Sequence, residues 1–193
     1  IVMTPDMLNL QWNSVAFYPA GYFTRGIMVE PSVTLPDGWK FGTALEVAAS
    51  NGATTTFKPI DFGNLVDSPM FAGRYFKQVD LDPNGPAPVR LDIVADRPEQ
   101  LEIKPEQLRA HQNLVQQAYR LYGSHHYDHY DFLLSLSEQM SGIGLEHHRS
   151  SEDGTDANYF VDWDKLAPAR DLLPHEYTHS WNGKFRRCAD LWT

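Results

Sequence analysis

Residues 172–181 read LLPHEYTHSW, and the five residues HEYTH point to both a fold and a chemistry. His175 and His179 are four residues apart, so on a helix their imidazoles lie on one face. Two neutral imidazoles at this spacing can bind a Zn²⁺ ion, which lowers the pKa of a bound water toward ~7. Glu176 cannot easily reach the same ion from the adjacent position. It can instead accept the proton of that water as a general base and pass it to a leaving amine.

The residues around HEYTH favour a packed metal-binding helix over an exposed helix that carries two surface histidines. Leu172, Leu173 and Trp181 supply apolar contacts on its flanks. Pro174 directly precedes the first histidine; it lacks a backbone N–H and restricts the residue before it. The helix therefore either begins near Pro174 or bends there, and the sequence leaves both open.

Composition limits the classes of protein to consider. A chain of 193 residues can form one core or two small domains, and 42% hydrophobic residues are typical of a soluble globular protein. The net charge of −9 argues against nucleic acid or an anionic membrane surface as the main partner. No apolar run approaches the roughly 20 residues of a membrane span. A single cysteine, Cys188, excludes an internal disulfide. Neither the compartment nor the oligomeric state follows from the sequence.

The first part of the chain is predicted to be β-rich. Short apolar runs alternate with turns that are rich in Gly, Pro and Asp. A boundary near residues 95–102 then separates a domain at 1–96 from a second domain at 97–193. The predicted strands of the first domain are 14–21, 26–36, 42–50, 53–60, 74–82 and 89–96.

The second part mixes helices and strands. Apolar residues recur at helical spacing from Pro105 to Tyr122, and Gly123 suits the end of that helix. The segments 130–137 and 143–151 read as strands. One helix is predicted to begin near Asp164, and another carries HEYTH and stops at Gly183. The fold class is therefore α+β.

Histidines and a short acidic motif place the chemistry in this second part. All eight histidines lie between His111 and His179. Upstream of HEYTH, residues 144–151 read GLEHHRSS, and a strand beside a zinc site can hold an extended peptide by backbone hydrogen bonds. A carboxylate on that strand can pair with the free α-ammonium of a substrate. We therefore predict that Gly144, Leu145 and Glu146 contact the substrate.

These motifs together resemble a known family. GLEH (Gly144–His147) followed by HEYTHSWNGKFRR (His175–Arg187) resembles the glycyl aminopeptidase family of zinc metallopeptidases, whose members often carry a PDZ domain. The stretch HYDHYDFLLSLSEQ (126–139) is similar to its central strand, and LVDSPMFAG (65–73) to its domain-joining segment. The resemblance implies a β-rich N-terminal domain followed by the N-terminal part of a thermolysin-like catalytic domain.

The resemblance also implies roles for single residues. Zn²⁺ would be bound by His175 and His179, with Glu176 as the base. By analogy with the motif that recognises N-termini in the larger aminopeptidase N-type enzymes, Glu146 would bind the amine of the substrate. The implied partner is a peptide with a free N-terminus.

The chain departs from the family pattern in three respects. Ile143 stands where the family commonly has a second glycine, and Cys188 stands where proline is usual. The third zinc ligand of such enzymes is a Glu on a later helix, which we expect to lie beyond Thr193; Asp190 is near in sequence but outside the helical face. The sequence does not begin with an initiator Met, and its first residues are similar to the middle of a strand-rich region. We therefore expect a fragment truncated at both ends that is inactive alone.

Three functions remain open at this stage. The leading hypothesis is a fragment of a zinc aminopeptidase that removes small N-terminal residues, of glycine or alanine type, from peptides. The second is a zinc endopeptidase in which Glu146 is merely structural. The third is a peptide-binding module of the same fold without a competent metal.

Overall fold

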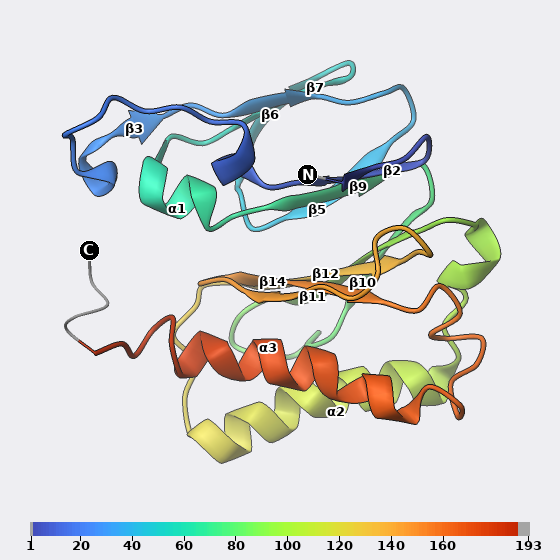
Figure 1. The fold of residues 1–193 in the computed structure, drawn as a ribbon. Coiled ribbons are helices and arrows are strands. Elements are labelled where there is room, and N and C mark those ends of the chain that lie inside the picture. The colour runs from blue at the N-terminus through green and yellow to red at the C-terminus, as the bar shows by residue number, and fades with distance from the viewer. Residues whose placement is uncertain (1, 189–193) are drawn as a thin grey trace.

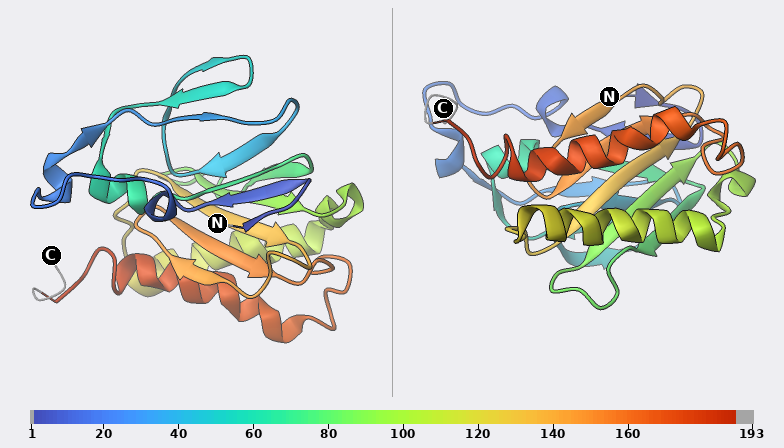
Figure 2. Two further views of the ribbon diagram at one scale, coloured as in Figure 1. Left: turned by 45° about the horizontal axis from the view of Figure 1, so that its top comes forward. Right: turned by 90° about the horizontal axis from the view of Figure 1, so that it is seen from below.

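Stacked β-sheets and, beneath them, two long helices make up the fold, which a computed structural model describes for residues 2–188 (Figure 1). We call residues 2–74 the N-terminal layer and residues 75–188 the C-terminal layer. The five-stranded sheet of the C-terminal layer lies between the N-terminal layer and the helices (Figures 1 and 2). This arrangement confirms the α+β class, with a β-rich first part.

The N-terminal layer contains three small antiparallel sheets and one short helix. The largest sheet has the strand order β1-β2-β9-β5, and the others are the pair β3-β8 and the triplet β4-β7-β6. A hydrophobic core joins these sheets and the helix; it consists of Trp12, Leu45, Phe57, Phe62, Leu65, Met70 and Ala72. The elements are β1 (Val2–Met3), β2 (Met7–Leu10), β3 (Met28–Val29), β4 (Ser32–Thr34), β5 (Lys40–Thr43), β6 (Val47–Asn51), β7 (Thr54–Phe57), β8 (Ile60–Asp61), α1 (Phe62–Val66) and β9 (Met70–Gly73).

The C-terminal layer is built on a mixed sheet with the order β10-β11-β12-β14-β13. Its three central strands, β11, β12 and β14, run parallel, and the outer strands are antiparallel to their neighbours. Strand β13 therefore lies at one edge. The strands are β10 (Phe76–Asp80), β11 (Val89–Ala95), β12 (Tyr130–Leu136), β13 (Gly144–Glu146) and β14 (Ser150–Thr155).

Helix α2 (Pro105–Tyr122) has the ends that its sequence predicts. Pro105 is its first residue, where the missing N–H costs no intrahelical bond. The side chain of Gln107 accepts a hydrogen bond from the backbone N–H of Lys104 at 2.8 Å. Gly123 ends the helix in the left-handed region at φ 70°, which glycine adopts without strain.

Helix α3 (Leu172–Trp181) carries HEYTH and begins two residues before Pro174. Pro174 therefore lies in the first turn, where no hydrogen-bond partner within the helix is lost. The helix predicted near Asp164 is wrong, because residues 158–166 form turns. They lead into a 3₁₀ helix, Ala167–Asp171, that contains Pro168 near its start. No helix within residues 2–188 combines the length and apolarity that crossing a membrane requires.

Each face of the five-stranded sheet packs against a different layer. Its outer face and the two helices share a core that includes Phe132, Leu134, Leu173 and Tyr177, each 1% exposed or less. Its inner face meets the N-terminal layer through a smaller apolar cluster. That cluster consists of Met7, Phe71, Val94, Leu133 and Met140. Burial on both faces explains why the middle of β12, Phe132–Leu134, is apolar on both faces instead of alternating with polar residues.

Most of the predicted strand segments contain or overlap strands of the structure: β3 and β4 lie in 26–36, β6 overlaps 42–50, and β7, β10 and β11 lie in 53–60, 74–82 and 89–96. The prediction of 130–137 is confirmed by β12. The strand predicted at 143–151 is a hairpin instead, with β13 and β14 on either side of a turn. The prediction of 14–21 is wrong, since this segment contains no strand and Phe17 is 98% exposed. Strands β2 and β9, which pair with each other, were not predicted.

The two layers divide earlier than the predicted domain boundary. Strand β11 ends directly before residue 96, yet it pairs along its whole length with β12. Strand β10 belongs to the same sheet. Sheet membership therefore separates the layers between Gly73 and Phe76, whereas the domain limit at residues 96 and 97 stays a prediction.

Candidate metal centre

Helix α3 brings the three side chains of the HEYTH motif together. The Nε2 atoms of His175 and His179 lie 3.2 Å apart. One ligand atom from each of His175, Glu176 and His179 falls within 4.8 Å of the others. Within residues 2–188, this is the one group of three or more metal-ligating side chains that lie close enough to share an ion.

The donor atoms fit a zinc ion. Two nitrogens that each lie ~2.0–2.1 Å from a tetrahedral ion are roughly 3.3 Å apart, close to the separation observed. The Nδ1–H of His179 donates to the carbonyl oxygen of Asn182 at 3.1 Å. This bond fixes the tautomer and leaves the lone pair of Nε2 free for a metal. The helix end, where Asn182 is the C-cap, thus orients one of the two ligands.

Glu176 is the buried member of the group, with 4% of its surface exposed. Burial raises the pKa of its carboxyl group, and the negative charge of Glu146 raises it further. The two histidines of the motif act in the opposite direction. A carboxylate with a raised pKa holds a proton more readily, which suits a group that accepts and returns one.

The edge strand β13 lies directly against this helix. A Cβ atom at Gly144 would collide with Oε1 of Glu176 and would lie 2.8 Å from Cδ1 of Leu172. A side chain at residue 144 would therefore have to displace the side chains of Glu176 and Leu172 or move the strand away from α3. The motifs GLEH and HEYTH, which are far apart in the sequence, are therefore in contact through Gly144 and Glu176.

Side chains alternate along β13 between two faces. Because Gly144 faces α3, Glu146 faces the same way, while Leu145 and His147 face the opposite way. Glu146 is half-buried and close enough to influence the pKa of Glu176. One edge of β13 pairs with β14, and within residues 2–188 no strand pairs with its other edge. Such an edge can accept an extended peptide.

Aromatic packing holds α3 in place beneath the sheet. The ring of Trp181 stacks on Tyr122 of α2 with 4.5 Å between centroids, and its Nε1 donates to the carbonyl of Ser124 at 2.8 Å. Tyr177, which is 1% exposed, forms a hydroxyl–hydroxyl contact with Tyr127. Residues on the buried side of the helix thus fix the direction in which its histidines point.

Several polar residues near the site were not predicted from the sequence. Asp67 of the N-terminal layer and Glu152 of β14 both contact His147. The side-chain amide of Asn9, in the N-terminal layer, donates a hydrogen bond to Glu152 at 2.7 Å. The contacts His147–Asp67 and Asn9–Glu152 join residues 80 and 143 positions apart, which no local sequence pattern marks. The contact His147–Glu152 spans five residues and depends on the turn between β13 and β14. Asp190, considered above as a substitute ligand, lies outside the described residues.

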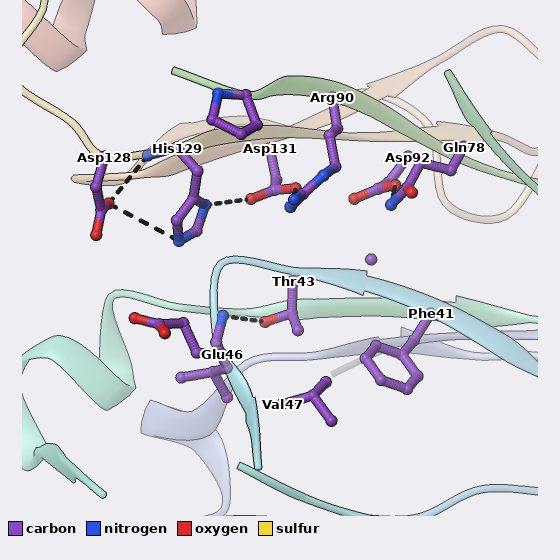
Figure 3. A pocket seen from close by; sticks show the side chains of 13 residues that line it. Phe41, Thr43, Glu46, Val47, Gln78, Arg90, Asp92, Asp128, His129 and Asp131 are labelled. Atoms are coloured by element: carbon purple, nitrogen blue, oxygen red, sulfur yellow. Dashed lines mark hydrogen bonds and ion pairs between the residues drawn. The ribbon is translucent and has the colours of Figure 1, made fainter. Parts of the chain in front are cut away.

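A second group of ionisable side chains lines a cleft of about 500 Å³ between the two layers (Figure 3). Asp131 accepts hydrogen bonds from Arg90 at 3.3 Å and His129 at 2.8 Å. Asp92, 1% exposed, accepts one from Gln78 at 2.8 Å. None of the side chains predicted to bind zinc or substrate lines this cleft, so it is separate from the HEYTH site.

Sequence profiles of one peptidase family match two parts of the chain, of which the second contains the HEYTH motif. The Peptidase M61 N-terminal domain matches residues 1–74, and M61 glycyl aminopeptidase matches residues 169–193. The first match ends where the N-terminal layer ends, and the second contains all of α3. The fold and the two profile matches together show that this chain is of the metallopeptidase class. The chain belongs to the M61 glycyl aminopeptidase family. No curated protein sequence matches it.

Solved structures of related fold are considerably longer. An aminopeptidase N family protein from Idiomarina loihiensis superposes with a TM-score of 0.74 at 18% identity, over 93% of this chain and 31% of its own. Native yeast LTA4 hydrolase gives 0.56 at 13%, over 93% and 29%. The M1 zinc metallopeptidase from Deinococcus radiodurans gives 0.50 at 13%, over 81% and 34%. At these identities the likeness shows the fold, and the chain spans about a third of each structure.

Proposed function

We propose that this chain forms the substrate-recognising side of a zinc aminopeptidase site that removes small N-terminal residues from peptides. The observation that carries the proposal is the contact between Gly144 and Glu176. It joins the exposed edge strand, which can bind a peptide, to the helix that carries two converging imidazoles. The N-terminal layer packs against the face of the five-stranded sheet that is opposite the helices.

Each side chain of the site has a proposed part in the reaction. His175 and His179 would hold Zn²⁺, which when bound acidifies a water molecule. Glu176 would accept the proton of that water and return it to the amine released from the cleaved peptide bond. Burial of Glu176 supports this role, because its raised pKa brings proton affinity nearer to neutral pH.

Recognition of the free amine is assigned to β13. Backbone groups of Gly144 and Leu145 would pair with the extended peptide, and the carboxylate of Glu146 would bind its α-ammonium. The side chain of Glu146 faces α3, the helix that carries Glu176. A peptide whose α-ammonium is bound by Glu146 would therefore have its first peptide bond near Glu176. The N-terminus of a peptide carries an α-ammonium that can pair with the carboxylate of Glu146, whereas an internal peptide segment has none.

A catalytic zinc usually has three protein ligands, and with Glu176 of the close group assigned as the base, the two histidines are the ligands proposed within residues 2–188. We therefore expect the 193-residue chain alone to bind zinc weakly and to be inactive. We assign the activity to the full-length protein, which is therefore the protein to measure.

The deciding experiment compares a peptide that has a free N-terminus with its N-acetylated form in the full-length protein. We expect cleavage of the free peptide, loss of activity with a chelator, and recovery on adding Zn²⁺. Equal rates on both peptides would favour an endopeptidase instead. A full-length protein that binds less than ~0.2 zinc per chain at saturating metal would favour a peptide-binding module without catalysis.

A further inference from the structure

His147 directly follows Glu146, and both of its ring nitrogens are held by carboxylates. Its Nδ1 lies 3.1 Å from Oδ1 of Asp67, and its Nε2 lies 2.9 Å from Oε2 of Glu152. Both nitrogens donate at once only in the imidazolium form, because carboxylates accept. His147 is 6% exposed and fully engaged, so it is available neither to a metal nor to a substrate.

The two carboxylates come from different layers. Asp67 directly follows helix α1 in the N-terminal layer, whereas Glu152 lies on β14, the strand that pairs with β13. Glu152 in turn accepts hydrogen bonds from two side chains of the N-terminal layer, Asn9 at 2.7 Å and Gln11 at 3.2 Å. The N-terminal layer therefore reaches the hairpin at two points that are distant in its own sequence.

Asp67 also links the hairpin to the segment that follows α3. Its Oδ2 accepts the backbone N–H of His148 at 2.8 Å, and its Oδ1 lies 3.1 Å from Nζ of Lys184. Lys184 comes three residues after the last residue of α3. One carboxylate thus contacts both the two residues that directly follow β13 and the segment that follows the HEYTH helix.

The alternation of side chains gives this network a mechanical consequence. Glu146 faces α3, whereas His147, the next residue, faces the N-terminal layer. Strand β13 has only three residues and pairs with one neighbour, so its own ladder fixes its position weakly. Burying charged groups is costly, and ionic networks of this kind are best attested as devices that fix register.

We propose that His147, gripped by Asp67 and Glu152, is a positioning residue that sets the place of Glu146 relative to the metal-binding helix. This inference rests on the proposed aminopeptidase function. The N-terminal layer then determines where the amine of the substrate sits, and so whether its first peptide bond reaches Glu176. Asp67 contributes to substrate recognition without touching the substrate.

The test uses Asp67→Asn in the full-length protein, with a free-amine peptide, its acetylated form and zinc content measured together. We expect at least a tenfold rise in KM for the free peptide, with kcat within about threefold and zinc unchanged. Preference for the free over the acetylated peptide should fall by a similar factor. Asp61→Ala is the matched control, because Asp61 caps the other end of α1 and has no contact with the hairpin among its hydrogen bonds.

A second measurement covers the case in which the variant loses too much activity for kinetics. Hydrogen exchange of the full-length protein should show faster exchange at residues 144–148 in Asp67→Asn and unchanged exchange there in Asp61→Ala. The proposal is overturned if zinc, kcat and the rates on both peptides fall together, or if exchange at 144–148 is unaltered. If the wild-type protein showed no preference for the free amine, the proposed function would be refuted. Exchange at residues 144–148 would then decide separately whether Asp67 holds this segment in place.

Discussion

Oε1 of Glu176 occupies the space that a Cβ atom at Gly144 would need. The two residues lie 32 positions apart in the sequence and on different elements, a strand and a helix. Their contact sets the distance between the strand that would bind the peptide and the carboxylate that would move the proton. Substitutions on either side of it should therefore separate binding from proton transfer.

Gly144→Ala should reduce turnover while leaving the protein folded. The new methyl group must displace the carboxylate of Glu176 or the strand itself, and a misplacement of about 1 Å at a reacting group costs on the order of 10²-fold. Measurement of kcat in the full-length protein tests this, with Gly26→Ala as the control because no atom lies within 4 Å of its added Cβ. Unchanged kcat in Gly144→Ala would show that the close approach has no part in catalysis.

Glu176→Gln should keep its metal and lose turnover by on the order of 10²–10⁴-fold, because glutamine cannot accept the proton of the water. Zinc content measured beside kcat separates this from a loss of the site. Near-normal turnover would remove Glu176 as the base, and loss of zinc would make it a ligand.

Glu146→Gln should weaken use of a free-amine peptide far more than it weakens zinc binding. A hydrogen bond to a charged group contributes about 1.5–3 kcal/mol, which corresponds to roughly 10–10²-fold in kcat/KM. The acetylated peptide, which lacks the ammonium, should be cleaved at an unchanged rate. If zinc content and kcat/KM fell in parallel, Glu146 would be a ligand or a structural support.

The sequence predicted the fold class, and it marked two motifs that the structure brings into contact, whereas the roles of their residues stay predictions. HEYTH and GLEH are local patterns, and the structure places their residues together as a strand and a helix in contact. Strand β9 was missed because MFAG is too short to show a period, and its pairing with β2 and β5 is entirely non-local. Asp67 was missed for the same reason, since only the packing of the two layers brings it to His147. Glu152 is only five residues from His147, but it meets His147 through the β13–β14 hairpin, which was predicted as a single strand.

Trp181→Ala should destabilise the protein by about 3–5 kcal/mol, the usual cost of truncating a buried large aromatic side chain. Trp181 is 7% exposed, and it carries both the stack on Tyr122 and a hydrogen bond to Ser124. Urea unfolding measures the change, and Leu121→Ala, at a position 74% exposed on the same helix as Tyr122, is the control. A loss below about 1 kcal/mol would mean that α3 is anchored elsewhere.

Asp92→Asn should remove part of the pH dependence of stability. Burial, together with the charge of Asp131, raises the pKa of Asp92 from 3.8 to about 8 (Figure 3). Between these values the folded chain keeps a proton that the unfolded chain releases, so stability falls as pH rises from about 4 to 8. Asparagine stays neutral, and the variant should therefore lose less stability than the wild type between pH 5 and pH 8 in thermal unfolding. Asp128→Asn is the control, because Asp128 is exposed and its pKa, held down by Arg149, is lowered. Equal pH slopes in the wild type and Asp92→Asn would show that Asp92 is ionised in the folded protein.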